Sequence, residues 1–386
     1  MLLILASVLQ TFAQNKKQIA EQLKAIMGKY EVVGVSLAVL KGNKIVYHNE
    51  LGEKNRENHT RLAKKDIFRI ASISKSFTAT SLMQLVEAGK ISLDDDISTL
   101  VGFPVRNPNF PDRKITLRML LSHRSSLNDS NGYTTLDVLD SVKTPSWANS
   151  FNKYAPGEGY MYCNLNYNLA GTILERVSGE RFDRYVQQHI LKPLHLYGGY
   201  WIDGLDSSRF VPLYAFNGAT HQFELSPDAY APRRQEIANY RMGYSTPILS
   251  PTGGMKISVR DLTRYMGMHM NYGTFKNKKI ISEESSRKMQ SVLTPENGYG
   301  MALEHNTTLL PGIDLTGHTG VAYGLFSAMF FNPKEKYGFV IITNGLDDSK
   351  GKDKFFSECM QLLYKAYIGD PATTFANPAT AFATLP

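Results

Sequence analysis

The sequence predicts an α/β protein of the α+β type, in which an antiparallel sheet formed by both chain ends is flanked by helices and a helical lobe is inserted between them. Paired apolar, β-branched runs occur near both ends, at residues 32–49 and 325–343. The interval between them is mostly helical in pattern, with loops rich in Pro, Gly, Asn and Tyr. Strands and helices therefore do not alternate as a parallel doubly wound fold requires.

The N-terminal end of the chain predicts a helix followed by a hairpin. Residues 15–28 carry apolar side chains at helical spacing on one face. Two apolar runs follow, at 32–40 and 44–49, and residues 41–43 between them read Lys-Gly-Asn. Such a sequence between two runs is typical of a β-hairpin turn. We therefore expect the two runs to be neighbouring antiparallel strands.

The C-terminal end predicts a second pair of strands, at 325–332 and 337–343, and then a helix at 354–367. In the helix, apolar side chains recur in register over four turns. We expect these strands to complete the sheet that the N-terminal hairpin begins.

Two terminal segments are expected to lie outside the folded domain. Residues 1–13 are apolar and end in Thr-Phe-Ala, a small-residue cleavage sequence, so they predict a signal peptide and a periplasmic or secreted protein. The alternative is the first turn of a buried helix, because the basic start of a full signal is absent. Residues 370–386, rich in Ala, Thr and Pro, predict a disordered tail. The remaining 14–369 form a single domain, with a sheet lobe from about 30–70 and 315–368.

Composition excludes several classes of function. Lys and Arg number 43 and Asp and Glu 35, a formal charge of +8, but no basic run interleaves with aromatics, so we expect no nucleic-acid partner. Cys163 and Cys359 predict two free buried thiols. No clustered Cys or His suggests zinc, so we expect no metal and no cofactor. No segment after the signal is long and apolar enough for a stable membrane span.

The first candidate catalytic pair is Ser72 and Lys75. Ser72 opens a helix whose N-terminal N–H groups favour developing negative charge. Lys75, three residues on, lies on the same helical face and can take the proton of the Ser72 hydroxyl. The Ser-x-x-Lys pattern also begins at Ser150, Ser285 and Ser349. Only the first opens a long apolar-faced helix, and capping of that helix is the alternative role of Ser72.

A second candidate pair, Tyr162 and Asn164, precedes a helical stretch at 167–177. Residues two apart in an extended segment point the same way. A tyrosine beside an ammonium group can serve as general base, and an asparagine offers a donor and an acceptor to an amide or ester. Ordinary packing of a tyrosine in a turn is the alternative.

The third candidate segment is His318-Thr319-Gly320, the one His-x-Gly in the chain. A small residue at this position lets a substrate lie along a strand edge and pair with its backbone. A structural histidine is the alternative.

In this order the three motifs resemble those of the penicillin-recognising, β-lactamase-related serine hydrolases. The closest likeness is to class C β-lactamases and the related D-alanyl-D-alanine carboxypeptidases and penicillin-binding-protein-like esterases. Segments at 115–123, 154–179, 253–262 and 317–344 also look like those of the family, so the resemblance extends from about 30 to 368.

The resemblance implies a role for each candidate residue. Ser72 would attack a carbonyl carbon and form an acyl-enzyme, while Lys75 and Tyr162 would move the proton and Tyr162 would activate water for deacylation. The backbone N–H groups of Ser72 and Val321 would form the oxyanion hole. The substrate-binding set that the resemblance implies is Asn164, His318, Thr319, Gly320 and Val321.

One departure from the family pattern bears on the substrate. Many β-lactamases carry Lys-Thr-Gly where this chain has His318-Thr319-Gly320. Lysine is cationic at neutral pH and can anchor a substrate carboxylate, whereas an unperturbed histidine is mostly neutral. We therefore expect a D-amino-acid peptidase or esterase that acts on a small molecule or peptide and associates with the cell wall. A true class C-like β-lactamase and a non-turnover sensor of cell-wall peptides or β-lactams are the alternatives.

An α/β-hydrolase is the rival enzyme class. That fold needs a Gly-x-Ser-x-Gly nucleophile elbow between a strand and a helix. The full pentapeptide is absent, and its nearest approach, at 34–38, lies inside an apolar run that predicts a strand.

Overall fold

The computed structural model describes residues 2–369, with side chains described from residue 16 onward. The predicted tail at 370–386 lies outside the described residues. Most of the predicted signal peptide forms the start of helix α1 (Leu2–Lys29), and its cleavage stays a prediction. No helix in the described range is both long enough and apolar enough to cross a membrane.

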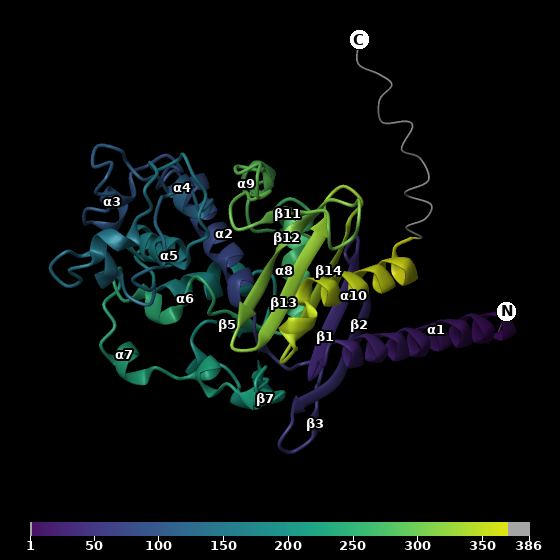
Figure 1. Ribbon diagram of the computed structural model, residues 1–386. Helices are drawn as coiled ribbons and strands as arrows, with labels where there is room; N and C mark the ends of the chain where they lie inside the picture. The colour runs from purple at the N-terminus through teal and green to yellow at the C-terminus, as the bar shows by residue number, and fades with distance from the viewer. Residues whose placement is uncertain (1, 370–386) are drawn as a thin grey trace, which may run out of the picture.

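One seven-stranded antiparallel sheet joins the two ends of the chain, which confirms the predicted fold class (Figure 1). The N-terminal hairpin meets the C-terminal strands where Val35 pairs with Thr343. In sheet order the strands are β11 (Glu304–Asn306), β12 (Leu315–Ala322), β13 (Leu325–Asn332), β14 (Tyr337–Thr343), β1 (Gly34–Lys41), β2 (Lys44–Asn55) and β3 (Thr60–Arg61).

Helices cover both faces of this sheet. Helix α1 and the C-terminal α10 (Lys352–Tyr367) pack on one face, and α8 (Val259–Met270) packs on the other. Successive β1 residues accordingly belong to different cores: Val39 faces the side of α1 and α10, and Leu40 faces the side of α8. Because successive strand residues point to opposite faces, a strand covered on both sides is apolar throughout. Burial on both faces of the sheet therefore explains the apolar runs in the sequence.

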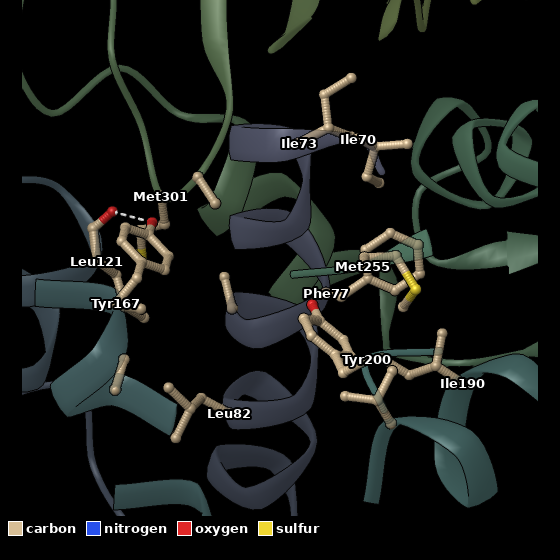
Figure 2. Close-up of a cluster of buried hydrophobic side chains, with 14 of the residues drawn as sticks. Ile70, Ile73, Phe77, Leu82, Leu121, Tyr167, Ile190, Tyr200, Met255 and Met301 are labelled. Carbon is tan, nitrogen blue, oxygen red and sulfur yellow. Dashed lines mark hydrogen bonds between the residues drawn. The ribbon is translucent and has the colours of Figure 1, made fainter. Parts of the chain in front are cut away.

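The inserted lobe is built around helix α2 (Ser74–Glu87), which is buried along most of its length. Figure 2 shows apolar side chains packed on both sides of this helix. Besides α8, the α-helices of the insertion are α3 (Ile97–Val101), α4 (Leu117–Leu121), α5 (Asn164–Ser178), α6 (Phe182–Val186), α7 (Arg234–Ala238) and α9 (Glu283–Gln290).

Three small sheets within the insertion were not predicted from the sequence. Their strands have two to four residues, which is too short to show a period-two pattern. They are β4 (Phe68–Arg69), β8 (Lys256–Ile257) and β5 (Gly198–Gly199) in one sheet, β6 (Tyr214–Asn217) with β7 (Gln222–Leu225), and β9 (Thr274–Phe275) with β10 (Lys278–Lys279).

Candidate active site

Ser72 lies where strand β4 turns into helix α2. A 3-10 turn at Ala71–Ile73 contains it, and α2 itself begins two residues later. Ala71 has a φ of 46°, a left-handed conformation that costs a non-glycine residue of order 1–3 kcal/mol. Because this sharp turn directly precedes Ser72, the hydroxyl stands at the helix start, as the sequence predicts.

The buried core fixes the position of helix α2. Ile73 and Leu82 are fully buried, and the Phe77 ring stacks on Tyr265 with the centroids 3.7 Å apart. On the side of α4 and α5, the Tyr167 hydroxyl donates a 2.6 Å hydrogen bond to the carbonyl of Leu121 (Figure 2). A catalytic group carried by α2 is therefore held by a rigid element.

Lys75 is fully buried and its amine has three protein partners. Nζ lies 3.0 Å from Ser72 Oγ, 2.9 Å from Asn164 Oδ1 and 3.1 Å from the Thr252 carbonyl oxygen. Burial lowers the pKa of the amine from 10.5 to about 7, although the nearby Asp129 carboxylate raises it. At neutral pH a large fraction of Lys75 is therefore the uncharged amine.

The amide of Asn164 joins Lys75 to a carboxylate. Its Oδ1 accepts from Lys75 Nζ and also from Thr252 Oγ1 at 2.8 Å, while its Nδ2 donates to Asp129 at 3.0 Å. This orientation is dictated by chemistry, since an ionised carboxylate only accepts hydrogen bonds. Both lone pairs of Oδ1 are used, so one N–H remains for a substrate. The sequence-based expectation of both a donor and an acceptor is narrowed to a donor.

Asp129 holds the start of helix α5 and was not identified from the sequence. Its carboxylate accepts from the backbone N–H groups of Asn164 and Leu165 at 2.8 and 3.0 Å, and from Cys163 Sγ at 3.2 Å. It thus caps a helix whose own N-cap residue, Cys163, provides no side-chain cap. The separation of about 35 residues explains why no local motif indicated it.

Tyr162 covers the buried amine from the side of the cavity. Its ring centroid is 4.8 Å from Lys75 Nζ and 4.4 Å from the imidazole of His123. The exposed 36% of Tyr162 belongs to the cavity wall. Desolvation raises the pKa of the phenol well above its usual value, and the adjacent Ser72 hydroxyl offsets this only in part. Tyr162 therefore holds its proton at neutral pH.

The third motif lies on strand β12, beside the turn that carries Ser72. The pairing of β11 with β12 stops at Glu304 and Gly317, so the β12 edge from His318 to Ala322 has no strand partner on that side in the described chain. An added Cβ at Gly320 would lie 2.4 Å from the Ile70 carbonyl oxygen, so only glycine permits this approach. The sequence-based expectation of an accessible strand edge agrees with this geometry.

The side chain of His318 is buried and neutral. Nε2 lies 3.1 Å from the Tyr299 hydroxyl, and Nδ1 faces the carbonyl of Thr319. Since a carbonyl only accepts, Nδ1 carries the proton and Nε2 accepts from the tyrosine. Desolvation, together with the charge of Lys75, lowers the pKa of His318 to about 3. The histidine therefore cannot replace the cationic lysine of the related motif.

One cavity of about 780 Å³ unites these parts. Lys75 contacts Ser72, Asn164 and Tyr162 but does not itself line the cavity. The other predicted residues all line it: Ser72, Tyr162, Asn164, His318, Thr319, Gly320 and Val321. Five further charged residues line this cavity and were not identified from the sequence: Arg69, Asp228, Arg233, Lys256 and Glu304. Within the described part of the chain, no three His, Cys, Asp or Glu side chains are grouped as metal ligands.

Comparison with known proteins indicates the family of this chain. The beta-lactamase family model matches residues 19–356. Protein flp of Staphylococcus aureus (strain N315) is 23% identical over 347 residues, covering 86% of this chain and 63% of that relative, so the chain spans less than two thirds of its length.

Solved structures share the fold. The octameric penicillin-binding protein homologue from Pyrococcus abyssi has a TM-score of 0.72 and 25% identity, covering 92% of this chain and 78% of that one. The D-amino acid amidase from Ochrobactrum anthropi SV3, complexed with L-phenylalanine, has a TM-score of 0.69 and 22% identity, covering 89% of this chain and 98% of that one. Because the family model spans most of the domain, the chain belongs to the beta-lactamase family.

Proposed function

We propose that this protein is a serine hydrolase that cleaves an amide or ester through an acyl-Ser72 intermediate, of the D-amino-acid peptidase or esterase type. The observation that carries the proposal is the set of partners around Lys75 Nζ. A neutral amine has two N–H donors and one lone pair. The donors match Asn164 Oδ1 and the Thr252 carbonyl, and the lone pair is then directed at the Ser72 hydroxyl.

In the acylation step, Ser72 Oγ attacks the substrate carbonyl carbon while its proton passes to Lys75 Nζ. The backbone N–H groups of Ser72 and Val321 stabilise the oxyanion of the tetrahedral intermediate. The bond to the leaving amine or alcohol then breaks, and the leaving atom receives a proton from Lys75 by way of the Tyr162 hydroxyl. The raised pKa of Tyr162 suits a group that donates this proton and regains another.

In the deacylation step, a water molecule attacks the acyl carbon. Tyr162 and Lys75 together accept the proton of the water and return one to Ser72 Oγ as the ester bond breaks. The substrate lies along the free edge of β12, where its backbone pairs with residues 319–321, and the remaining N–H of Asn164 donates to its carbonyl.

The neutral His318 favours the peptidase or esterase type over a β-lactamase. A β-lactam substrate carries a carboxylate that a lysine at this position would anchor, and His318 supplies no such charge. The likeness to a D-amino acid amidase supports the fold on which this proposal depends. Export to the periplasm or the exterior, and association with the cell wall, remain predictions.

Labelling with a serine-reactive fluorophosphonate tests the nucleophile. We expect Ser72→Ala to abolish labelling, whereas Ser150→Ala and Ser285→Ala, which change buried serines of the same local pattern, keep it. Persistent labelling of the Ser72 variant would remove the central claim.

The acyl-donor class is tested by comparing a chromogenic cephalosporin, a short-chain nitrophenyl ester and a D-Ala-D-Ala peptide on one preparation. We expect turnover of the ester or the peptide. Fast cephalosporin turnover would contradict the inference from His318, and labelling without turnover of any substrate would indicate the sensor alternative.

A further inference from the structure

Two basic side chains lie next to each other in the floor of the cavity. Lys256 is on the central strand of the β4–β8–β5 sheet, and its register partner on β4 is Arg69. Directly opposite residues of an antiparallel pair project from the same face, so the two side chains are neighbours. On the other side, the partner of Lys256 is Gly199, which has no side chain. Like charges placed directly opposite are destabilising.

Neither basic side chain has an acidic partner. Lys256 is 6% exposed, and its amine donates one hydrogen bond, to the Tyr200 carbonyl at 2.7 Å. Arg69 donates Nε to the Gly253 carbonyl at 2.9 Å and Nη1 to the Ala229 carbonyl at 3.2 Å. No ion pair in the described chain involves either residue. A buried ammonium group with one neutral partner is costly unless something else compensates it.

The carboxylates that border the same cavity do not neutralise this basic pair. Two carboxylates border the same cavity, Asp228 at its exposed rim and Glu304 on strand β11, and neither forms an ion pair with the cations. Burial, with the charge of Arg69 as a second cause, lowers the pKa of Lys256 well below its usual value. An anion placed between the two side chains would stabilise the protonated form of Lys256 and satisfy its remaining N–H groups.

We propose that Arg69 and Lys256 form a subsite for a carboxylate carried by the acyl donor, so that the enzyme prefers acidic acyl groups. This inference rests on the proposed function, because the subsite and Ser72 border one cavity. It places the anchoring charge on the β4–β8 floor, whereas the third motif, with its neutral His318, supplies none.

A carboxylate matches the donors available. The Lys256 amine retains two N–H groups after its bond to Tyr200, and two hydrogen bonds satisfy two carboxylate oxygens. The Arg69 guanidinium donates two of its five N–H groups to carbonyls, and its face packs 5.0 Å from the Tyr323 ring, so it adds its charge and its remaining donors to the subsite.

The test compares two esters of equal length, mono-p-nitrophenyl glutarate and p-nitrophenyl valerate, which differ in a terminal carboxylate against a methyl group. We expect the wild-type kcat/KM to favour the glutarate ester, and Lys256→Met to lower this preference at least about tenfold, as expected for loss of a charge-assisted hydrogen bond. Lys256→Arg should restore much of the preference.

The matched control is Lys336→Met. Lys336 also donates to a backbone carbonyl, that of Met270 at 2.9 Å, but it lies outside the cavity, and its variant should keep the wild-type preference. If Lys256 merely supports the Tyr200 loop, Lys256→Met will lower kcat/KM equally for both esters. That equal loss, or an unchanged preference, would overturn the proposal.

A binding experiment separates the subsite from the chemistry. In Ser72→Ala protein, glutarate monoamide should bind more tightly than pentanamide by calorimetry, and Lys256→Met added to this variant should remove the difference. If wild-type protein hydrolyses neither ester while this difference persists, the proposed function fails and the subsite stands. Equal binding of the two amides would overturn the subsite, and any hydrolysis of valerate that depends on Ser72 would leave the proposed function intact.

Discussion

At the scale of single residues, the surroundings of Lys75 determine what the site can do. Its amine is fully buried and surrounded by oxygen acceptors, with no carboxylate in direct contact, so the charged form is penalised more than it is stabilised. Below a pH of about 7 the penalty is fully present, because the folded protein must bury the ammonium. The unfolded chain binds the proton more strongly, so the free energy of unfolding rises as the pH increases from about 7 towards 10.5.

The same pKa predicts the pH dependence of acylation. Only the neutral amine can take the Ser72 proton, so kcat/KM for a nitrophenyl ester should fall on acidification, with a midpoint close to pH 7. The measurement is a pH profile from about pH 5 to about pH 9.

A second group could produce the same acidic limb. Burial also raises the pKa of the Glu304 carboxyl in the cavity wall to about 7. Glu304→Gln separates the two, since the limb should keep its midpoint if Lys75 is responsible. Disappearance of the limb in this variant would assign it to Glu304.

At the scale of secondary-structure elements, the site depends on two junctions. The first is the N-terminus of helix α5, where Asp129 accepts from two backbone N–H groups and also holds the Asn164 side chain. The second is the contact between strand β12 and the 3-10 turn that carries Ser72, where Gly320 lies against Ile70. Each junction joins segments that are far apart in the sequence.

Replacement of Asp129 tests the first junction. Asp129→Ala should lower the free energy of unfolding by about 1–3 kcal/mol, because it leaves buried donors unsatisfied, and should lower kcat at least about tenfold, because Asn164 no longer positions Lys75. Urea unfolding and ester kinetics measure the two effects.

The control for this variant is Asp96→Ala. Asp96 caps α3 through the N–H of Ser98, away from the cavity, so its loss should reduce stability without a comparable fall in kcat. Equal effects of the two variants on kcat would show that Asp129 has only a structural role.

Replacement of Gly320 tests the second junction. In Gly320→Ala the new methyl group meets the Ile70 carbonyl and the Ser327 hydroxyl at 2.4 and 2.5 Å, so strand and turn must separate. We expect a fall in kcat/KM of about a hundredfold from loss of oxyanion stabilisation, and a loss of about 1–3 kcal/mol in stability. Gly218→Ala, where no atom lies within 4 Å of the added Cβ, should be neutral in both measurements. An active Gly320→Ala enzyme would argue against tight contact between β12 and the turn.

At the scale of the whole molecule, the large sheet separates two hydrophobic cores, of which only one supports the candidate site. One core lies between the sheet and helices α1 and α10, and the other extends from α8 through α2 into the inserted lobe. The buried apolar residues that line the cavity of the site, among them Ala71, Tyr200 and Leu249, belong to the second core, and in Figure 1 α1 and α10 lie apart from the inserted lobe. Stability and activity are therefore expected to respond differently to changes in the two cores.

Two truncations test this division. Leu363→Ala, in the core under α10, should cost about 2–5 kcal/mol of stability while the folded enzyme keeps its kcat and KM within about twofold. Phe77→Ala, in the core around α2, should cost about 3–5 kcal/mol and also lower kcat, because α2 carries Lys75. Chemical unfolding and ester kinetics below the unfolding transition give both values. A large fall in kcat for Leu363→Ala would contradict the expectation that the core under α10 contributes to stability alone.

Four strands of the large sheet, β1, β2, β13 and β14, and the helices α1 and α10 were predictable because their signals are local and long. The strands β1, β13 and β14 are apolar runs of seven or eight residues, and α10 has clear helical periodicity. The small β4–β8–β5 sheet was not predictable, since its strands have two residues each and form only when three distant segments meet.

The candidate site divides in the same way. Ser72, Lys75, Tyr162, Asn164 and residues 318–321 were identified because each belongs to a short motif, and the structure brings them together. Asp129 and Glu304 belong to no motif, and the family-like segment at 253–262 did not indicate that its Lys256 borders the site.

The sequence by itself therefore determined the fold class and the candidate residues, because periodicity and motifs are properties of neighbouring residues. Only the tertiary structure decided that Lys75 has a pKa of about 7, that His318 is neutral, and that Arg69 and Lys256 face the cavity side by side. The physical reason is that desolvation and cross-strand pairing arise only when segments distant in the chain enclose a group and exclude water from it.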